Sequence, residues 1–367
     1  MEFGAAILTA VGAPLRIERV TLGKLGPSDV LIRTRASGLC HTDLEVMTGD
    51  LPYPLPIVLG HEGAGVVEAV GGSVTRVVPG DHVVASWNPH CGHCFYCERN
   101  LPILCEPSNQ HQLAGTMLDG QTKLFWRGER LHHFSHVSGF AEYLIVPESG
   151  AIAVPREMPF DRACLLGCGV MTGYGAVSRI AKVEAGSSVV VVGCGIVGLN
   201  VLQAAQLEGA ARIIAIDRDP IKLALARQFG ATDAQLASDG TIADVKAITE
   251  GRGADYVFEA AGSEASIQLA LELARPGGRV VILGKTEANR KIGVRFGSLV
   301  GEKRIVRSSY GGARPRTDFP WMAQLYLNGK LKLDELITSR LALDQINDGF
   351  DAMRRGTGLR CVVTFDA

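Results

Sequence analysis

Two kinds of apolar pattern alternate along this chain. Up to about residue 169, short alternating or β-branched runs are broken by glycine and proline, which is typical of an irregular β domain with loops. From about residue 170 to 310, continuous apolar runs alternate with stretches of helical periodicity. Strands that are buried on both faces and joined by helices predict a parallel, doubly wound sheet. The expected elements are strands 30–35, 65–70, 82–85 and 143–146 in the first segment, and strands 189–192, 212–216, 256–259 and 279–283 with helices 197–208, 221–229 and 267–273 in the second.

The pattern loosens again in the last segment, where we expect a helix at 321–327 and a final strand at 361–365. Because this tail has the same short apolar runs and breaks as the first segment, we expect it to rejoin that domain. The predicted fold is therefore α/β, with a discontinuous outer β domain at residues 1–169 and 311–367. A doubly wound sheet domain at residues 170–310 is expected to be inserted into it.

Composition narrows the range of partners. The 367 residues suffice for two ordinary domains. Lys plus Arg (37) nearly balance Asp plus Glu (38), so no global field favours nucleic acid or an anionic membrane surface. The N-terminal stretch has no basic region followed by an apolar one, and no apolar run approaches about 20 residues. We therefore expect a cytosolic protein that acts on a small molecule.

Four of the nine cysteines lie close together, in the run CGHCFYCERNLPILC. Four thiolates on one short loop can close a tetrahedron around zinc and leave no open position, so such a site stabilises a loop and does no chemistry. A disulfide pair or free thiols are the alternative, and the cytosol disfavours disulfides. His90 and His93 lie within or beside the loop, and we interpret both as bystanders. The predicted structural zinc ligands are Cys91, Cys94, Cys97 and Cys105.

A glycine motif follows the apolar strand at 189–192 and precedes a predicted helix. Gly193 permits the turn, Gly195 lets the backbone approach a pyrophosphate, and Gly198 lets the helix pack on the strand. A purely structural glycine-rich turn is the alternative. The strand and helix on either side favour a dinucleotide-binding loop.

Asp217 stands at the end of the next apolar run, where a carboxylate can accept hydrogen bonds from an adenosine ribose and repel a 2′-phosphate. This predicts NAD as the cofactor. The neighbouring Arg218 can stack on adenine or soften the repulsion, so use of both NAD and NADP stays open. Lys222 can reach the ribose or remain a solvated surface lysine.

Six motifs in order along the chain resemble the signatures of the zinc-dependent medium-chain alcohol dehydrogenase family. They are CHTD, GHEGAG, the four-cysteine lobe, GCGVMTGYG, GCGIVG and the closing LRCVVTF. The resemblance covers essentially the whole chain, and the long segment between Cys105 and Cys168 is similar to that of the class III and aryl-alcohol dehydrogenase-like branch. It implies a GroES-like β domain, an inserted Rossmann domain and an active site in the cleft between them.

The resemblance also implies a second, catalytic zinc ion. Cys40, His61 and Cys168 look like its ligands, with water or an alcohol oxygen in the fourth position, as Lewis-acid catalysis requires. Their spacing alone says little, because each has a plainer explanation as a buried thiol or a core histidine. Cys164 is the rival of Cys168, and we assign Cys164 to the core because only Cys168 has the GCGxxTGYG context.

Four residues near these ligands are expected to serve the zinc ion or proton transfer. Glu62 resembles the family's carboxylate behind the zinc, and Asp43 resembles the acceptor that orients His61. Thr42 is expected to accept the alcohol proton and pass it to the nicotinamide ribose. Glu45 stands where relatives have a histidine that releases this proton to solvent, and either Glu45 does the same or the relay ends in water. Surface acids and a turn threonine are the plainer alternatives.

Further residues are expected around the cofactor and the substrate. His41 and Arg360 resemble the cations at the cofactor pyrophosphate, and Thr172 and Val197 resemble the residues that press on the nicotinamide ring. Leu51, Trp87 and Phe134 align with the wall of the substrate pocket. A tryptophan there narrows the cavity near the metal, which favours primary over bulky secondary alcohols.

The expected activity is reversible hydride transfer from a primary aliphatic or benzylic alcohol to NAD, with two zinc ions per chain. The nearest alternative is an S-(hydroxymethyl)glutathione dehydrogenase, which pairs a substrate carboxylate with an arginine where this chain has Asn109. A metal-stabilised binding module without catalysis is the alternative from another class. The resemblance to dimeric branches and the apolar edge at 304–308 predict a homodimer.

Overall fold

The computed structural model describes residues 1–287 and 289–365, and it divides the chain into two compact units. The first unit contains Met1–Cys168 and Arg314–Ala367, and the second contains Gly169–Ala313. The expected domain limits differ from these by one residue at the first crossing and by three at the second. The first unit is rich in β-strands, and the second unit, with its parallel sheet, is inserted between the two segments of the first. This mixed α/β fold confirms the predicted fold class.

Strands of the first unit form a closed barrel and a larger sheet. The barrel consists of β1 (Glu2–Leu8), β2 (Arg16–Leu22), β7 (Leu124–Trp126), β8 (Glu129–His133) and β4 (Ile57–Val58). The sheet runs in the order β10 (Ala151–Ala153), β6 (His82–Ala85), β5 (Glu62–Val70), β3 (Asp29–Gly38), β18 (Arg360–Thr364) and β17 (Ile337–Leu341), with β9 (Tyr143–Pro147) also paired to β3.

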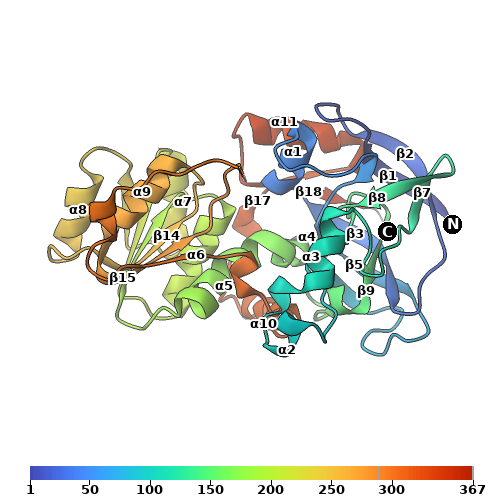
Figure 1. Cartoon of the computed structure of the whole chain (residues 1–367), viewed down its shortest axis with the longest axis horizontal. Helices are drawn as coiled ribbons and strands as arrows, with labels where there is room; N and C mark the ends of the chain where they lie inside the picture. The colour runs from blue at the N-terminus through green and yellow to red at the C-terminus, as the bar shows by residue number, and fades with distance from the viewer. Residues whose placement is uncertain (288, 366–367) are drawn as a thin grey trace. The chain divides into compact units, whose positions relative to one another are not determined.

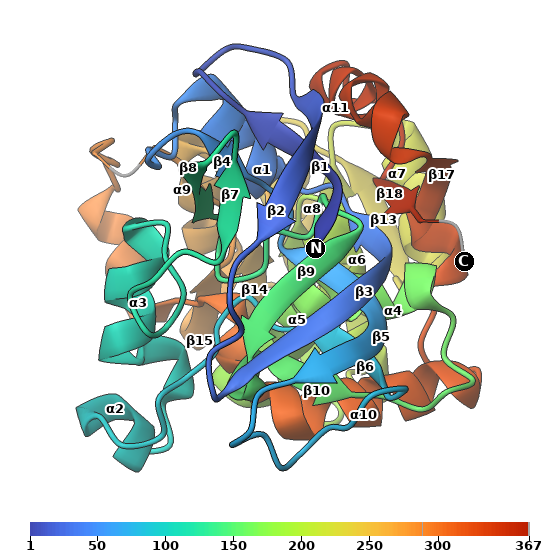
Figure 2. The same ribbon diagram turned by 90° about the vertical axis from the view of Figure 1, so that its right-hand side faces the viewer.

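The C-terminal strand returns to the first segment, because β18 pairs antiparallel with β3. Figure 2 shows β9, β3, β5, β6 and β10 side by side in this unit. The start of β5 and the end of β3 face each other in register, so residues that flank these strand ends are brought together. The helices of the first unit are α1 (His41–Thr48), α2 (Phe95–Glu98), α3 (Glu106–Leu113), α4 (Phe160–Leu165), α10 (Pro315–Leu327) and α11 (Ile346–Arg354).

One continuous helical run, Phe160–Ala181, was not expected from the sequence pattern. It starts as α4, passes through a π-helical stretch at Leu166–Val170, continues as α5 (Met171–Gly175) and ends in a second π-helical stretch at Ala176–Ala181. Its length and apolar composition would suit a membrane span, but 72% of its apolar window is buried inside the fold. It is therefore a core helix, and its four glycines are tolerated because burial stabilises it.

The second unit is a parallel sheet in the order β13-β12-β11-β14-β15-β16, and helices flank it (Figure 1). The chain moves outward from β11 to β12 and β13 and then returns to β14 on the other side of β11, so the strand order reverses between β11 and β14. Ligands of doubly wound sheets bind beyond the carboxyl ends of the strands at such a switch point. The elements are β11 (Ser188–Val192), α6 (Ile196–Leu207), β12 (Arg212–Asp217), α7 (Pro220–Gln228), β13 (Asp233–Leu236), α8 (Thr241–Ile248), β14 (Ala254–Glu259), α9 (Glu264–Leu273), β15 (Ala274–Ile282) and β16 (Arg304–Arg307).

Candidate active site

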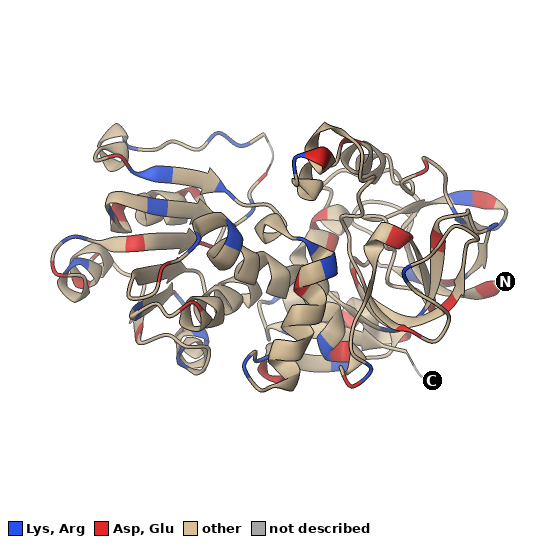
Figure 3. Cartoon of the chain, turned by 90° about the horizontal axis from the view of Figure 1, so that it is seen from below, with Lys and Arg blue, Asp and Glu red and all other residues tan. Residues whose placement is uncertain are grey.

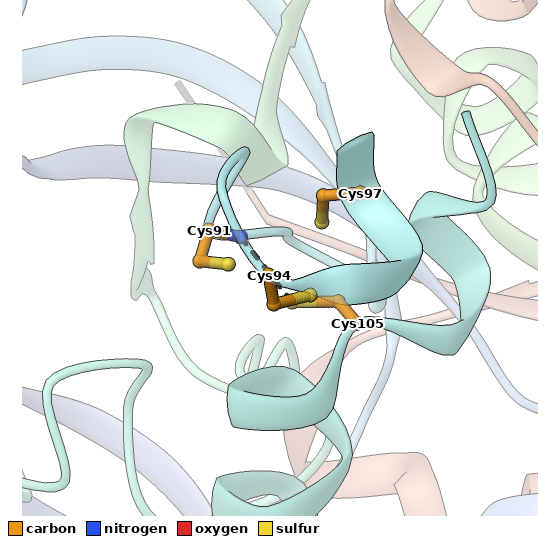
Figure 4. A group of neighbouring side chains, drawn as sticks. All are labelled: Cys91, Cys94, Cys97 and Cys105. Atoms are coloured by element: carbon orange, nitrogen blue, oxygen red, sulfur yellow. Dashed lines mark hydrogen bonds between the residues drawn. The ribbon is translucent and has the colours of Figure 1, made fainter. Parts of the chain in front are cut away.

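The four cysteines of the lobe come together as predicted from their spacing. Their sulfur atoms all lie within 4.8 Å of one another and are turned inward (Figure 4). Cys94 caps the start of α2, Cys97 lies within α2, and Cys105 precedes α3. The backbone amide of Cys91 donates a hydrogen bond to the Cys105 sulfur over 3.3 Å.

The charges within the lobe suit a divalent cation. Hydrogen bonds from the backbone, chiefly from Cys97, lower the pKa of Cys94 to about 6, whereas burial raises the pKa of Cys97 to about 12. Burial also raises the pKa of Cys105. Four thiolates cannot share this space without a positive ion, and zinc supplies that charge in sites of this kind. Neither His90 nor His93 belongs to the cluster.

A second cluster joins residues that are far apart in the sequence. Ligand atoms of Cys40, His61, Glu62 and Cys168 all lie within 4.8 Å of one another. Cys40 is the N-cap of α1, two residues after β3 ends at Gly38, and Glu62 begins β5 with His61 directly before it. Cys168 lies in the first π-helical stretch, a local geometry that is frequent at functional sites. Cys164 is outside the cluster, and its sulfur donates to the carbonyl of Asp161 at 3.3 Å.

Asp43 ties the two loops of this cluster together. Its Oδ2 accepts a hydrogen bond from the Cys40 amide at 3.0 Å, and its Oδ1 accepts one from the Gly60 amide at 3.0 Å. The same Oδ1 lies 3.2 Å from Nδ1 of His61. A proton held on Nδ1 by this carboxylate leaves the Nε2 lone pair available for a metal ion. The predicted orienting contact is therefore present in the structure.

The thiols and the imidazole of the cluster are strongly coupled. The hydrogen bond with Cys168 holds the pKa of Cys40 well below its usual range, and the same contact together with burial raises that of Cys168. Burial opposes protonation of His61, yet the charges of Asp43 and Cys40 outweigh it and raise the pKa of His61. Such a buried group of thiols and an imidazole is the donor set that zinc prefers.

Glu62 faces a buried arginine behind the cluster. Its Oε1 lies 3.2 Å from Nη2 of Arg360, and the two side chains are 0% and 5% exposed. Burial raises the pKa of Glu62 to about 7, although Arg360 opposes that shift. Arg360 also donates a hydrogen bond to the carbonyl of Leu39. The pyrophosphate role expected for Arg360 stays a prediction, because the structure shows its guanidinium engaged with Glu62.

The residues expected in the proton relay lie on α1. Thr42 is partly buried, and the Cys40 sulfur lies 3.9 Å from its hydroxyl. Glu45 is partly exposed one turn further on, and His41 is exposed at the start of the helix. Thr42 therefore lies beside the ligand cluster, and the exposed His41 lies in contact with solvent. The roles of the three residues remain predictions.

The expected pocket residues fall into two apolar clusters. Phe134 is fully buried, and its ring lies edge-on to His61 with the centroids 5.5 Å apart. Leu51 packs against the same cluster, whereas Trp87 packs against another. Tyr53 was not singled out from the sequence, yet its ring packs on Phe134 at 5.0 Å. No motif marks Tyr53, because its proximity to Phe134 depends on how the barrel closes.

The glycine loop of the second unit has the features of a phosphate-binding turn. Gly193 has a left-handed backbone with φ of 96°, and a Cβ at Gly198 would lie 1.9 Å from the Gly193 carbonyl oxygen. A Cβ at Gly195 would meet nothing within 4 Å, so the space over the second glycine is open. The N-terminus of α6 begins there and directs free amides at that space. These residues fit a dinucleotide pyrophosphate.

Asp217 ends β12 beside this loop. Its Oδ2 accepts a hydrogen bond from the Cys194 amide at 2.7 Å, and its Oδ1 accepts one from Asp219 at 2.9 Å. Arg218 is exposed and Lys222 is partly exposed one turn into α7. Asp217 thus joins the end of β12 to the glycine loop, and its ribose contact stays a prediction.

Thr172 and Val197 lie on neighbouring helices of this unit. A Cβ at Gly173, next to Thr172, would come within 2.5 Å of the Val197 carbonyl oxygen. Close packing of α5 on α6 at this glycine therefore brings the two residues together, while their contact with nicotinamide stays a prediction.

Comparison with known proteins agrees with both units. Residues 26–156 match the model of the alcohol dehydrogenase GroES-like domain, and residues 197–328 match that of the zinc-binding dehydrogenase domain. An S-(hydroxymethyl)glutathione dehydrogenase of Escherichia coli is 40% identical over 369 residues, with both chains covered in full.

Two solved structures are similar over the whole of both chains. An alcohol dehydrogenase zinc-binding domain protein from Burkholderia ambifaria is 37% identical with a TM-score of 0.95. The benzyl alcohol dehydrogenase of Acinetobacter calcoaceticus is 32% identical with a TM-score of 0.94. Together with the two cysteine clusters and the glycine loop, these similarities show that the chain belongs to the zinc-dependent medium-chain alcohol dehydrogenase family.

Proposed function

We propose that this protein catalyses reversible, NAD-dependent oxidation of a primary aliphatic or benzylic alcohol to the aldehyde. The observation that carries the proposal is the convergence of Cys40, His61 and Cys168 around one point, with Asp43 orienting the histidine. Cys40, His61 and Cys168 would hold a zinc ion there, and a site with three such protein ligands would leave room for a substrate oxygen. The lobe of four cysteines has no such vacancy and is assigned a structural role.

The reaction removes a hydride from the alcohol carbon and a proton from its oxygen. Zinc, when bound, supplies Lewis-acid polarisation of that oxygen, and the nicotinamide ring accepts the hydride. Thr42 is suited to accept the proton at its hydroxyl, since this group lies beside Cys40. Glu45, on the next turn of α1, is suited to release the proton to solvent. Asp43 keeps the His61 tautomer fixed throughout.

The cofactor assignment depends on Asp217. A carboxylate at the end of β12 accepts hydrogen bonds from the ribose hydroxyls of NAD and repels the 2′-phosphate of NADP. The hydrogen bonds that Asp217 accepts from Cys194 and Asp219 hold it at the edge of the glycine loop. We infer that NAD is the preferred cofactor, with His41, Thr172, Val197 and Gly195 among its contacts.

The benzyl alcohol dehydrogenase relative favours an aromatic primary alcohol as the substrate. Leu51 and Phe134 belong to one apolar cluster and suit such a ring, whereas Trp87 packs against another cluster. The S-(hydroxymethyl)glutathione dehydrogenase relative supports a second candidate substrate, the adduct of formaldehyde with glutathione. That substrate carries carboxylates, and the exposed Asn109 of α3 offers no positive charge to bind one. The aromatic alcohol is therefore the first choice.

A substrate panel tests the proposal. The zinc-loaded enzyme is assayed with aliphatic alcohols, benzyl alcohol and S-(hydroxymethyl)glutathione, each with NAD and NADP, and zinc per chain is counted. We expect the highest kcat/KM with a primary alcohol and NAD. Higher activity on the glutathione adduct would replace the first candidate with the second, and NADH binding without turnover of any alcohol would contradict an enzymatic function.

We also propose that the enzyme is a cytosolic homodimer without nucleic-acid or membrane partners. Lys and Arg are interspersed with Asp and Glu along the ribbon of both units (Figure 3), and the two kinds of charge nearly balance. β16 ends the parallel sheet, and its Ile305 is 46% exposed. An apolar residue on an open edge strand suits pairing with a second copy across a twofold axis. Sedimentation at the mass of a monomer would contradict the dimer.

A further inference from the structure

Glu259 is a fully buried acidic residue at the carboxyl end of β14. It is 0% exposed, and it pairs in register with Val192 at the end of β11 and Ile282 at the end of β15. Glu259 therefore stands at the switch point, where the strand order reverses between β11 and β14. Metal binding and proton transfer involve other residues, so this carboxylate needs an explanation of its own.

The two carboxylate oxygens of Glu259 have different surroundings. Oε1 accepts hydrogen bonds from the amide of Ala261 at 2.8 Å, the amide of Gly262 at 2.6 Å and the hydroxyl of Ser266 at 2.7 Å. Oε2 receives no hydrogen bond from any of residues 1–287 or 289–365. Three donors on one oxygen suit an acceptor-only group such as a carboxylate.

Among residues 1–287 and 289–365, no Lys, Arg or His side chain forms an ion pair with Glu259. Arg307 lies close enough to be influenced by Glu259, but its Nη1 donates to the carbonyl of Ile282 at 2.9 Å and to the carbonyl of Ser308. A buried charge without a close partner is costly, so it persists where it serves a ligand or a loop. Glu259 thus leaves negative potential at the end of the sheet.

The free oxygen lies directly behind a loop at the carboxyl edge. The amides of Leu283 and Gly284 donate to the Glu259 carbonyl at 2.7 and 3.0 Å, which draws this loop over the end of β14. A Cβ at Gly284 would come within 2.6 Å of Oε2 and 2.2 Å of the Gly262 amide. Oε2 therefore lies close to the backbone of this loop at Gly284.

The topology indicates which half of a dinucleotide lies over this loop. Asp217, at the end of β12, is on one side of β11 and suits the adenosine ribose, and the glycine loop after β11 suits the pyrophosphate. The remaining half must extend to the other side of β11, over the ends of β14 and β15. That half carries the nicotinamide ring.

We propose that Glu259 is a positioning residue that shapes the loops beneath the nicotinamide and favours its oxidised, positively charged form over the reduced form. The inference rests on the proposed use of NAD. The oxidised ring carries a positive charge that the reduced ring lacks, so a fixed buried carboxylate stabilises only the former. Its Oε1 contacts hold the 260–262 turn in place for both forms.

The test compares the dissociation constants of NAD+ and NADH in wild-type protein and in Glu259→Gln, measured by calorimetry and by NADH fluorescence. The glutamine keeps the size and an acceptor oxygen but removes the charge. We expect the ratio Kd(NAD+)/Kd(NADH) to rise on the order of tenfold. Asp255→Asn is the matched control, because Asp255 lies on the same strand and is paired with Arg275 at 2.6 Å. Its ratio should equal that of the wild type.

A second variant covers the case in which Glu259→Gln does not fold. Ser266→Ala removes one donor from Oε1 and leaves the carboxylate less shielded, so the ratio should fall below the wild-type value. An unchanged ratio in either folded variant, or equal changes of both constants, would overturn the charge effect. Wild-type protein that binds neither nucleotide would instead overturn the proposed NAD-dependent function.

Discussion

Asp43 and His61 form a buried contact in which Oδ1 of the carboxylate lies 3.2 Å from Nδ1 of the imidazole. The two side chains are 0% and 3% exposed. Because Asp43 also accepts hydrogen bonds from the amides of Cys40 and Gly60, it holds two metal-ligand loops at once. A single residue of α1 thus determines both the position and the tautomer of the histidine.

Replacing Asp43 with asparagine should weaken zinc binding at the Cys40 cluster about 10- to 100-fold. An asparagine has one acceptor oxygen, so its NH2 group would face the amide of Cys40 or of Gly60. Zinc release to a chromogenic chelator measures the loss. Asp50→Asn is the control, since Asp50 is exposed just beyond the C-terminal end of α1, where it accepts a hydrogen bond from the Thr48 hydroxyl. Equal zinc retention in both variants would contradict an orienting role.

Replacing Cys97 with serine should remove one of the two proposed zinc ions per chain and make the segment 91–105 sensitive to proteolysis. Serine supplies no thiolate, and this segment has little buried apolar surface to hold its shape without the metal. Elemental analysis and limited proteolysis measure both effects. Cys164→Ala should keep both ions, because Cys164 is outside either cluster. Loss of a zinc ion in that control would return Cys164 to the list of ligands.

Replacing Arg360 with methionine should destabilise the zinc-loaded protein by about 3–5 kcal/mol, because it leaves Glu62 buried without its partner. The double variant Glu62→Gln with Arg360→Met removes both charges and should recover part of this loss. Urea unfolding of the two single variants and the double variant completes the cycle. Additive losses would show that the 3.2 Å contact contributes no coupling.

Replacing Asp217 with asparagine should lower the ratio of kcat/KM with NAD to kcat/KM with NADP by about tenfold or more. A factor of this size is what the loss of one charge contact typically produces. The variant removes the negative charge that is proposed to repel a 2′-phosphate, while keeping an acceptor for the Cys194 amide. Asp219→Asn is the control, since Asp219 caps α7 and asparagine caps a helix equally well. An unchanged ratio in Asp217→Asn would move cofactor selection to Arg218 or Lys222.

Local chemistry was easier to predict than long-range contacts. The four-cysteine lobe follows from spacing within one loop, and the roles of Gly193 and Gly198 follow from backbone sterics that any strand-to-helix turn imposes. Cys40, His61 and Cys168 required the family resemblance, because no spacing rule links residues so far apart. Fold class and strands could be predicted because apolar runs mark them directly.

Three features could not be predicted from the sequence pattern, for physical reasons. The helical run Phe160–Ala181 contains glycines that lower helix propensity, and only its burial stabilises it. The Glu62–Arg360 pair joins the two ends of the chain through β5 and β18, which no local signal reveals. Glu259 ends the expected strand 256–259, and only its burial in the structure distinguishes it.

Replacing His133 with glutamine should reduce the loss of stability that occurs between pH 7 and pH 5. Burial, with the nearby charge of His136, lowers the pKa of His133 to about 3, from an ordinary value of 6.5. Its Nε2 accepts a hydrogen bond from the Lys123 amide at 3.1 Å, so the neutral ring is built into the fold. Below pH 6.5 the unfolded chain binds a proton that the folded chain does not bind, and stability therefore falls as the pH falls.

For one such histidine, this linkage amounts to about 2 kcal/mol between pH 7 and pH 5. The shift of the urea midpoint between the two pH values, with zinc in excess, measures it. His133→Gln should be less stable at pH 7 yet show the smaller shift, because glutamine does not titrate. His132→Gln is the matched control, since the neighbouring His132 is partly exposed. Equal shifts in wild-type protein and His133→Gln would mean that His133 takes up its proton inside the folded barrel.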